Sequence, residues 1–143
     1  MGVQVDAYKA FKNALTTSSL RGIVKTWKFN RKQIQLQNVT LPMIMCFPAT
    51  LSEEFITMPK GKLGYLTLTI SGKITNGNPD TLEEELLAFD EKIKNVIETD
   101  LQLDGEVTIE NIGTSNYYLL DDMVADTIFN VIITTKKFTA GLR

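Results

Sequence analysis

Apolar and polar residues alternate most regularly in two long stretches, one in the middle of the chain and one near its end. Within Leu63–Thr75, Leu66, Leu68 and Ile70 alternate with polar or aromatic neighbours. This period of two predicts a long strand with one buried face. Within Met123–Lys137, apolar residues occupy both alternating sets, which predicts a strand that is central in the sheet.

Between these stretches, Asp80–Thr99 has helical periodicity. Asp80 or Thr81 is expected to cap the helix, and Thr81 with Glu84 forms a capping box. The apolar residues recur at three- and four-residue spacing along one stripe: Leu82, Leu86, Phe89, Ile93, Val96 and Ile97. Burying such a stripe is worth on the order of 10 kcal/mol before conformational entropy is subtracted, so we expect this helix to pack against the sheet. Asp90 falls on its polar side and is expected at the surface.

Weaker patterns complete the chain. A helix is predicted over Val3–Leu15. Two alternating runs, Gly22–Asn30 and Gln33–Val39, are joined by a turn at Asn30–Lys32 and predict a β-hairpin arm. The remaining predicted strands are short: Leu41–Phe47, Ser52–Met58, Glu106–Ile112 and Tyr117–Leu120. The pattern therefore predicts an α+β fold in one domain over residues 1–143, with an antiparallel or mixed β-sheet packed by two amphipathic helices and a β-hairpin arm.

Composition agrees with a single globular domain. The chain has 143 residues, of which 43% are hydrophobic and 22% are charged. No apolar run approaches the ~20 residues that span a bilayer, so we expect no membrane segment. The first residues, Met1–Asp6, show no basic and apolar signal pattern, so we expect no secretion, and the lone cysteine is consistent with a reducing compartment.

Charge is divided unevenly along the chain, although the net charge is only −2. Residues 1–40 hold seven basic residues and one acidic residue, a balance of +6, whereas residues 41–143 hold eight basic and sixteen acidic residues, a balance of −8. Such asymmetry is typical of nucleic-acid arms and also of subunits whose unlike faces meet head to tail and close into rings.

The basic part includes one stretch in which cations and aromatic residues are interleaved. Single-strand binders use this combination, but the overall acidity disfavours a nucleic-acid protein because affinity comes largely from phosphate neutralisation. We expect instead an intersubunit contact anchored by Trp27. The residues of this predicted subunit interface are Lys25, Trp27, Lys28, Phe29, Arg31 and Lys32.

Catalytic and metal-binding chemistry has little support. The chain contains no histidine, and Cys46 lies in an apolar run typical of a buried strand, without the activation that a nucleophilic thiol needs. Carboxylates at Asp121-Asp122 with Asp126, or at Glu83-Glu84-Glu85, match no calcium loop and are more typical of solvated turns and caps. We therefore predict no enzyme activity, no cofactor and no metal.

Two other function classes stay open. A small α+β module that binds a ligand or RNA would act as a monomer or dimer. An enzyme using carboxylates, lysine or tyrosine would have only one local cluster to draw on, Tyr117-Tyr118 with Asp121-Asp122.

The order of elements resembles the tail terminator (tail completion) proteins of long-tailed bacteriophages. The segment Thr40–Pro48, with Leu-Pro before an apolar strand and a second proline after it, resembles one piece of that family. Gly64–Ile70 followed by Asn78-Pro79 resembles its long strand and loop. Leu86–Ile97 and the closing strand through Val131-Ile132-Ile133 resemble its second helix and last strand. The likeness covers most of the chain, apart from the basic stretch.

This resemblance implies a structural role. The chain would form a homohexameric ring that caps the tail tube, stops its polymerisation and docks the head–neck connector protein. Genomic DNA would pass through the lumen without specific binding. The protein would be found at the tail–neck junction of the virion, and in the host cytoplasm during assembly. Another ring component of the phage neck or tail is the nearest alternative. No active-site residues accompany this family.

Overall fold

The computed structural model describes residues 3–32, 39–56, 61–101, 103, 107–121 and 123–138. These residues form a mixed sheet of six strands and two α-helices, which confirms the predicted α+β class. In chain order the elements are α1 (Val3–Thr16), the short 3₁₀ helix η1 (Ser19–Gly22), β1 (Thr26–Lys28), β2 (Met43–Ile56), β3 (Gly61–Thr75), α2 (Pro79–Thr99), β4 (Val107–Ile112), β5 (Asn116–Asp121) and β6 (Val124–Phe138).

The strand order places β1 at one edge of the sheet and β4 with β5 at the other. The order is β1-β2-β3-β6-β4, and β5 pairs with β6 as well. Among the described strands, β1 and β2 pair in parallel and the other pairs are antiparallel. β4 pairs with 131–135 of β6 and β5 with 124–128, so the two strands form one edge interrupted at residues 113–115. β6 is central, as its two apolar faces predicted.

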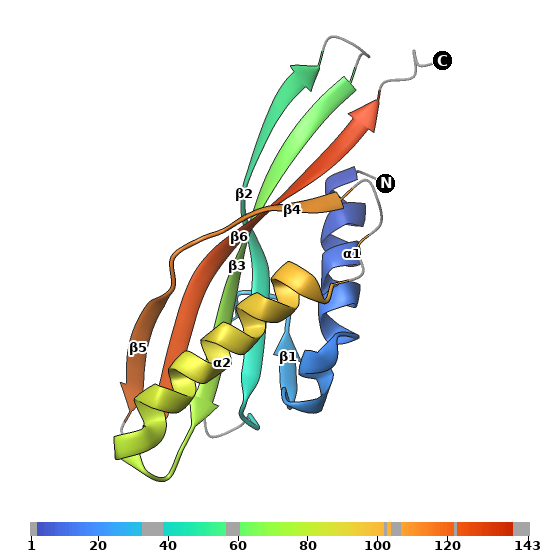
Figure 1. Cartoon of the computed structure of the whole chain (residues 1–143). Helices are drawn as coiled ribbons and strands as arrows, with labels where there is room; N and C mark the ends of the chain where they lie inside the picture. The colour runs from blue at the N-terminus through green and yellow to red at the C-terminus, as the bar shows by residue number, and fades with distance from the viewer. Residues whose placement is uncertain are drawn as a thin grey trace.

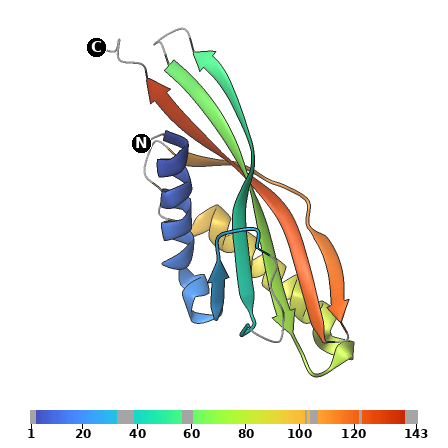
Figure 2. The same ribbon diagram turned by 180° about the vertical axis from the view of Figure 1, so that it is seen from behind.

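Both helices cover the same face of the sheet (Figure 1), and the view from behind shows β2, β3 and β6 in front of α2 (Figure 2). The core forms between helices and sheet, where Phe11 of α1, Ile93 of α2, Ile70 of β3 and Phe129 of β6 belong to one buried cluster. The three long strands continue beyond the helices at one end, so the molecule is elongated along the strands (Figure 1).

The strand β2 corrects one prediction. The runs Leu41–Phe47 and Ser52–Met58 were expected to be two strands separated at Pro48, but Met43–Ile56 is one continuous strand. The pairing with β3 shifts register between Pro48 and Thr50, which marks a β-bulge. Proline lacks the N–H that a regular ladder needs, and a bulge is one of the places where a strand tolerates it.

The start of α2 corrects a second prediction. The helix begins at Pro79 and its cap is Asn78, not Asp80 or Thr81. The Asn78 side-chain oxygen accepts a hydrogen bond of 3.0 Å from the Asp80 amide. Proline suits the first helical position because its missing N–H would have had no helical partner there. The apolar stripe itself is confirmed, since all six of its residues are buried.

The strand in the N-terminal region is shorter than the alternation of apolar and polar residues predicted. Of the expected strand Gly22–Asn30, only Thr26–Lys28 forms β1; Gly22 ends η1, and residues 23–25 belong to neither element. β1 pairs with β2 in parallel, Trp27 lying opposite Ile44. The second arm of the predicted hairpin, Gln33–Val39, lies outside the described residues except for Val39.

At Gly72, side chains of α2 lie close to the backbone of β3. A Cβ atom at this position would lie 2.9 Å from Ile93 Cδ1 and 2.9 Å from Phe89 Cε2. Both neighbours are buried, so a larger side chain has to displace the helix or force poor rotamers. We expect Gly72→Val to lower the free energy of unfolding by about 1–3 kcal/mol, measured by urea denaturation.

Gly77 provides the matched control, because it lies in the loop before α2 and a Cβ there would meet nothing within 4 Å. Gly77→Val is expected to change stability by less than about 0.5 kcal/mol. Equal effects of the two substitutions would contradict the close approach of α2 to β3.

Candidate assembly surfaces

The structure brings the six residues of the predicted subunit interface together at the β1 edge of the sheet. Lys25, Arg31 and Lys32 are exposed, whereas Lys28 is half-buried. Trp27 and Phe29 are also half-buried and pack against the protein's own core. The basic surface, defined as Lys25, Lys28, Arg31 and Lys32, is therefore mainly cationic.

The two aromatic residues are held by neighbours within the chain. The Trp27 and Phe29 rings stack with centroids 6.2 Å apart and planes 9° apart. The ammonium of Lys12 lies 5.5 Å from the Phe29 ring, and the Arg31 guanidinium lies 4.8 Å from the Phe47 ring and donates a hydrogen bond to the Pro48 carbonyl. Such cation–π contacts fix the segment against the sheet.

The opposite edge carries an apolar surface that the sequence did not single out. We define the β5 surface as Leu87 of α2 with Tyr117, Tyr118, Leu119 and Leu120 of β5. These five side chains are between 41% and 65% exposed. Exposed apolar side chains along an edge strand are an aggregation hazard for a monomer and are common at protein–protein contacts.

A groove accompanies this surface. It has a volume of about 320 Å³ and lies between the first turns of α2 and β5, lined by Glu83, Leu86, Leu87 and Tyr117. Three of the four lining side chains are apolar or aromatic, and the carboxylate belongs to the helix. The groove can thus receive an apolar group, and the Glu83 carboxylate at the groove could pair with a cation of the same partner.

Asp90 holds β5 against α2. This residue was expected at the surface but is 6% exposed, which corrects the prediction. Its Oδ1 accepts hydrogen bonds from Ser115 (2.7 Å) and Thr127 (2.8 Å), and its Oδ2 accepts one from the Tyr117 hydroxyl (3.1 Å). Lys94, one helical turn away, lies 4.0 Å from Oδ2. A buried carboxylate with these partners is satisfied, and it joins the helix to β5 and β6.

The Tyr117-Tyr118 pair does not converge on a reactive centre. Tyr117 lies opposite Thr127 and turns to the helix side, whereas Tyr118 lies opposite Asp126 on the other face. Burial, and then the nearby Asp90 charge, raise the pKa of Tyr117 above its ordinary value. The phenol therefore stays protonated at neutral pH and acts as a donor to Asp90.

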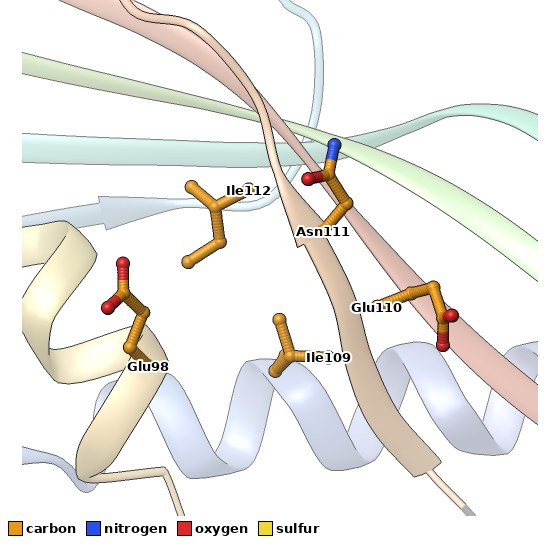
Figure 3. A pocket seen from close by; sticks show the side chains of 5 residues that line it. All are labelled: Glu98, Ile109, Glu110, Asn111 and Ile112. Atoms are coloured by element: carbon orange, nitrogen blue, oxygen red, sulfur yellow. The ribbon is translucent and has the colours of Figure 1, made fainter.

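A second groove lies along β4. It has a volume of about 400 Å³ and is lined by Glu98, Ile109, Glu110, Asn111 and Ile112. Figure 3 shows Ile109 and Ile112 pointing toward Glu98 at the end of α2, while Glu110 and Asn111 point to the other side of the strand. The bulge between Ile109 and Asn111 produces this arrangement.

The face of the sheet away from the helices has a buried ion pair. Lys73 Nζ lies 3.4 Å from Asp126 Oδ2, and the Ser71 hydroxyl donates a 2.7 Å hydrogen bond to Asp126 Oδ1. A hollow of about 290 Å³ lies over this pair, with Arg31 and Phe47 also lining it. Lys73 further donates to Ser71 Oγ at 2.8 Å, so its ammonium is engaged within the chain.

The Asp126 carboxyl gives a pH-dependence with a defined sign. Burial raises the pKa of Asp126 above its ordinary value, although Ser71 and Lys73 act in the opposite direction. Its contribution to stability is therefore fully present below the unfolded pKa of about 4 and is lost as pH rises through the folded value. We expect Asp126→Asn to gain stability relative to the natural chain between pH 4 and pH 7, measured by urea denaturation. A relative loss over that range would contradict the raised pKa.

The remaining candidate chemistry has structural explanations. Cys46 is buried in β2, and burial raises the pKa of its thiol to about 12. Among the described residues, no three histidine, cysteine or carboxylate side chains gather as metal ligands would. Asp122 lies outside the described residues, so the predicted Asp121-Asp122 cluster is only partly described. None of the described helices has the length and apolar character needed to cross a membrane.

Comparisons with protein families and curated proteins found no match, so the basic surface and the β5 surface are the main observations that bear on function. No protein-family model matches the chain, and no curated protein matches it either.

Proposed function

We propose that this chain is the structural subunit of a ring that caps the tail tube of a long-tailed bacteriophage, ends its polymerisation and docks the head–neck connector. The observation that carries the proposal is the unlike character of the two sheet edges. One edge presents the basic surface and the other the apolar β5 surface. A contact between unlike surfaces of identical chains is heterologous, and it closes into a ring when the rotation between copies allows.

The arrangement of the fold supports a scaffold role. Three long strands and two helices form one core, and the described interior contains no buried side-chain nitrogen or oxygen without a hydrogen-bond partner. Such a body holds its shape while its edges make contacts. The proposal also draws on the resemblance of the sequence pattern to tail terminators.

The proposed mechanism uses geometry. Copies join edge to edge until the circle closes with six subunits around a lumen that DNA can traverse. One face of the ring reproduces the contacts of a tube subunit and binds the tube end, while the other face lacks the next tube-docking surface and binds the connector. Growth of the tube therefore stops where the ring binds.

Electron microscopy of tail tubes tests the proposal. Tubes assembled from the tube protein of the same phage in the presence of this chain are expected to be shorter and to carry a ring at one end. Tubes of unchanged length with bare ends would contradict the capping role. Tight binding of RNA or a small ligand by a monomer or dimer would favour the binding module instead.

A further inference from the structure

We infer that the β5 surface and its groove receive the basic surface of a second copy of this chain. The inference rests on the proposed ring and identifies the pair of surfaces that closes it. In this arrangement the two edges of one sheet bind different neighbours. Each subunit contributes its basic edge to one neighbour and its apolar edge to the other.

The register of the sheet places the basic surface and the β5 surface at the same position along the strand direction. Thr26 of β1 pairs with Met43, Met43 with Lys73, Lys73 with Asp126, and Asp126 with Tyr118 of β5: one row crosses the whole sheet. If the ring axis runs roughly along the strands, rotation about it leaves every copy at the same position along the strand direction. Rotation about such an axis therefore brings β1 of one copy beside β5 of the next.

The groove along β4 does not fit this geometry. Ile109 of β4 is level with Ile133, Leu66 and Leu51, a row that β1 does not reach. In this arrangement β1 of the neighbouring copy does not reach that groove. The β5 surface is thus the part of the edge that meets β1.

Charges complement one another across the proposed contact. Glu83 lines the groove, Glu84 is its exposed neighbour on α2, and neither forms an ion pair within the described part of the chain. On the other edge, Lys25 and Lys28 likewise lack ion-pair partners among the described residues. On the β5 side, the contact would have tyrosine and leucine at its centre and the two carboxylates at its rim, where they can pair with the cations of the facing edge.

A charge exchange tests the pairing of the two surfaces. Lys25→Glu with Lys28→Glu, and separately Glu83→Lys with Glu84→Lys, are each expected to raise the dissociation constant of the ring on the order of tenfold or more. Mixing the two double variants restores the attraction at the contacts between unlike copies, so mixed assemblies should form where neither variant assembles alone. Sedimentation velocity measures all three samples.

Matched controls separate a local contact from a general charge effect. The first control, Lys9→Glu with Lys92→Glu, changes the net charge as much as Lys25→Glu with Lys28→Glu does, but at exposed residues of α1 and α2. The second control, Glu98→Lys with Glu110→Lys, reverses the charge of the β4 groove. Both controls are expected to assemble as the natural chain does. Loss of assembly with the β4 variant, together with unchanged assembly of the β5 variant, would overturn the inference.

The apolar part of the contact has an independent readout. Leu119 is the most exposed side chain of the β5 surface, so Leu119→Lys is expected to leave the fold unchanged and to abolish assembly at micromolar concentration. Leu51→Lys, at another exposed leucine, is the control. Trp27 is the only tryptophan, and its emission should shift to shorter wavelength as the natural chain assembles.

The outcomes distinguish the contact from the ring itself. Rings that still form with Leu119→Lys would overturn the proposed contact, while the ring proposal itself would still hold. If the natural chain stays monomeric at every concentration and at tube ends, the proposal that it forms a ring is contradicted.

Discussion

Replacing Asp90 by alanine is expected to lower the free energy of unfolding by about 3 kcal/mol. The substitution removes the acceptor of three hydroxyl groups, those of Ser115, Tyr117 and Thr127. The Thr127 hydroxyl is buried, so it loses its partner without gaining water. Urea denaturation followed by circular dichroism measures the change.

Glu91 is the matched control, since it is the next residue of the same helix and is exposed. Glu91→Ala should change stability by less than about 0.5 kcal/mol. Hydrogen exchange adds a local test: the amides of β5 should exchange faster in Asp90→Ala than in the natural chain, because Asp90 joins β5 to α2. A cost no greater than that of Glu91→Ala would contradict the anchoring role.

Replacing Ile93 by alanine is expected to cost about 3 kcal/mol, within the range of 2–5 kcal/mol that buried isoleucines show. Ile93 is fully buried and lies over Gly72, where a cavity would form. Because α2 covers both β3 and β6, the loss should appear as one cooperative transition at lower urea concentration.

Leu87 of the same helix is the natural comparison, because it is apolar but 53% exposed. Leu87→Ala should leave the unfolding free energy of the monomer within about 0.5 kcal/mol of the natural value. It should nevertheless weaken assembly, since Leu87 belongs to the β5 surface. Equal stability losses at Ile93 and Leu87 would contradict the orientation of α2.

The parts of the fold that sequence predicted are those fixed by local periodicity. The stripe of α2 and the alternation of β3 depend on neighbours a few residues apart, and both are confirmed. The partners of the strands depend on distant residues, so neither the parallel pairing of β1 with β2 nor the bulge that accommodates Pro48 could be read from the pattern.

The candidate site was predicted in part. The cations at 25–32 do gather at one edge, but the anchoring role expected for Trp27 stays a prediction. Asp90 was missed because a helical wheel places it beside polar residues. Thr127 gave a signal for it, since a polar side chain between Ala125 and Phe129 on the inward face needs a partner. Likewise, the unbroken apolar run Tyr117–Leu120 could have pointed to the β5 surface, because such a run is typical of a strand covered on both faces, whereas these four side chains are exposed in the described structure.

Native mass spectrometry of the natural chain at increasing concentration tests the central claim most directly. A closed head-to-tail ring predicts one dominant oligomer of fixed size, with six copies as the expected number, in equilibrium with the monomer. A chain that remains monomeric, or that stops at a two-fold dimer with like edges joined, would contradict it.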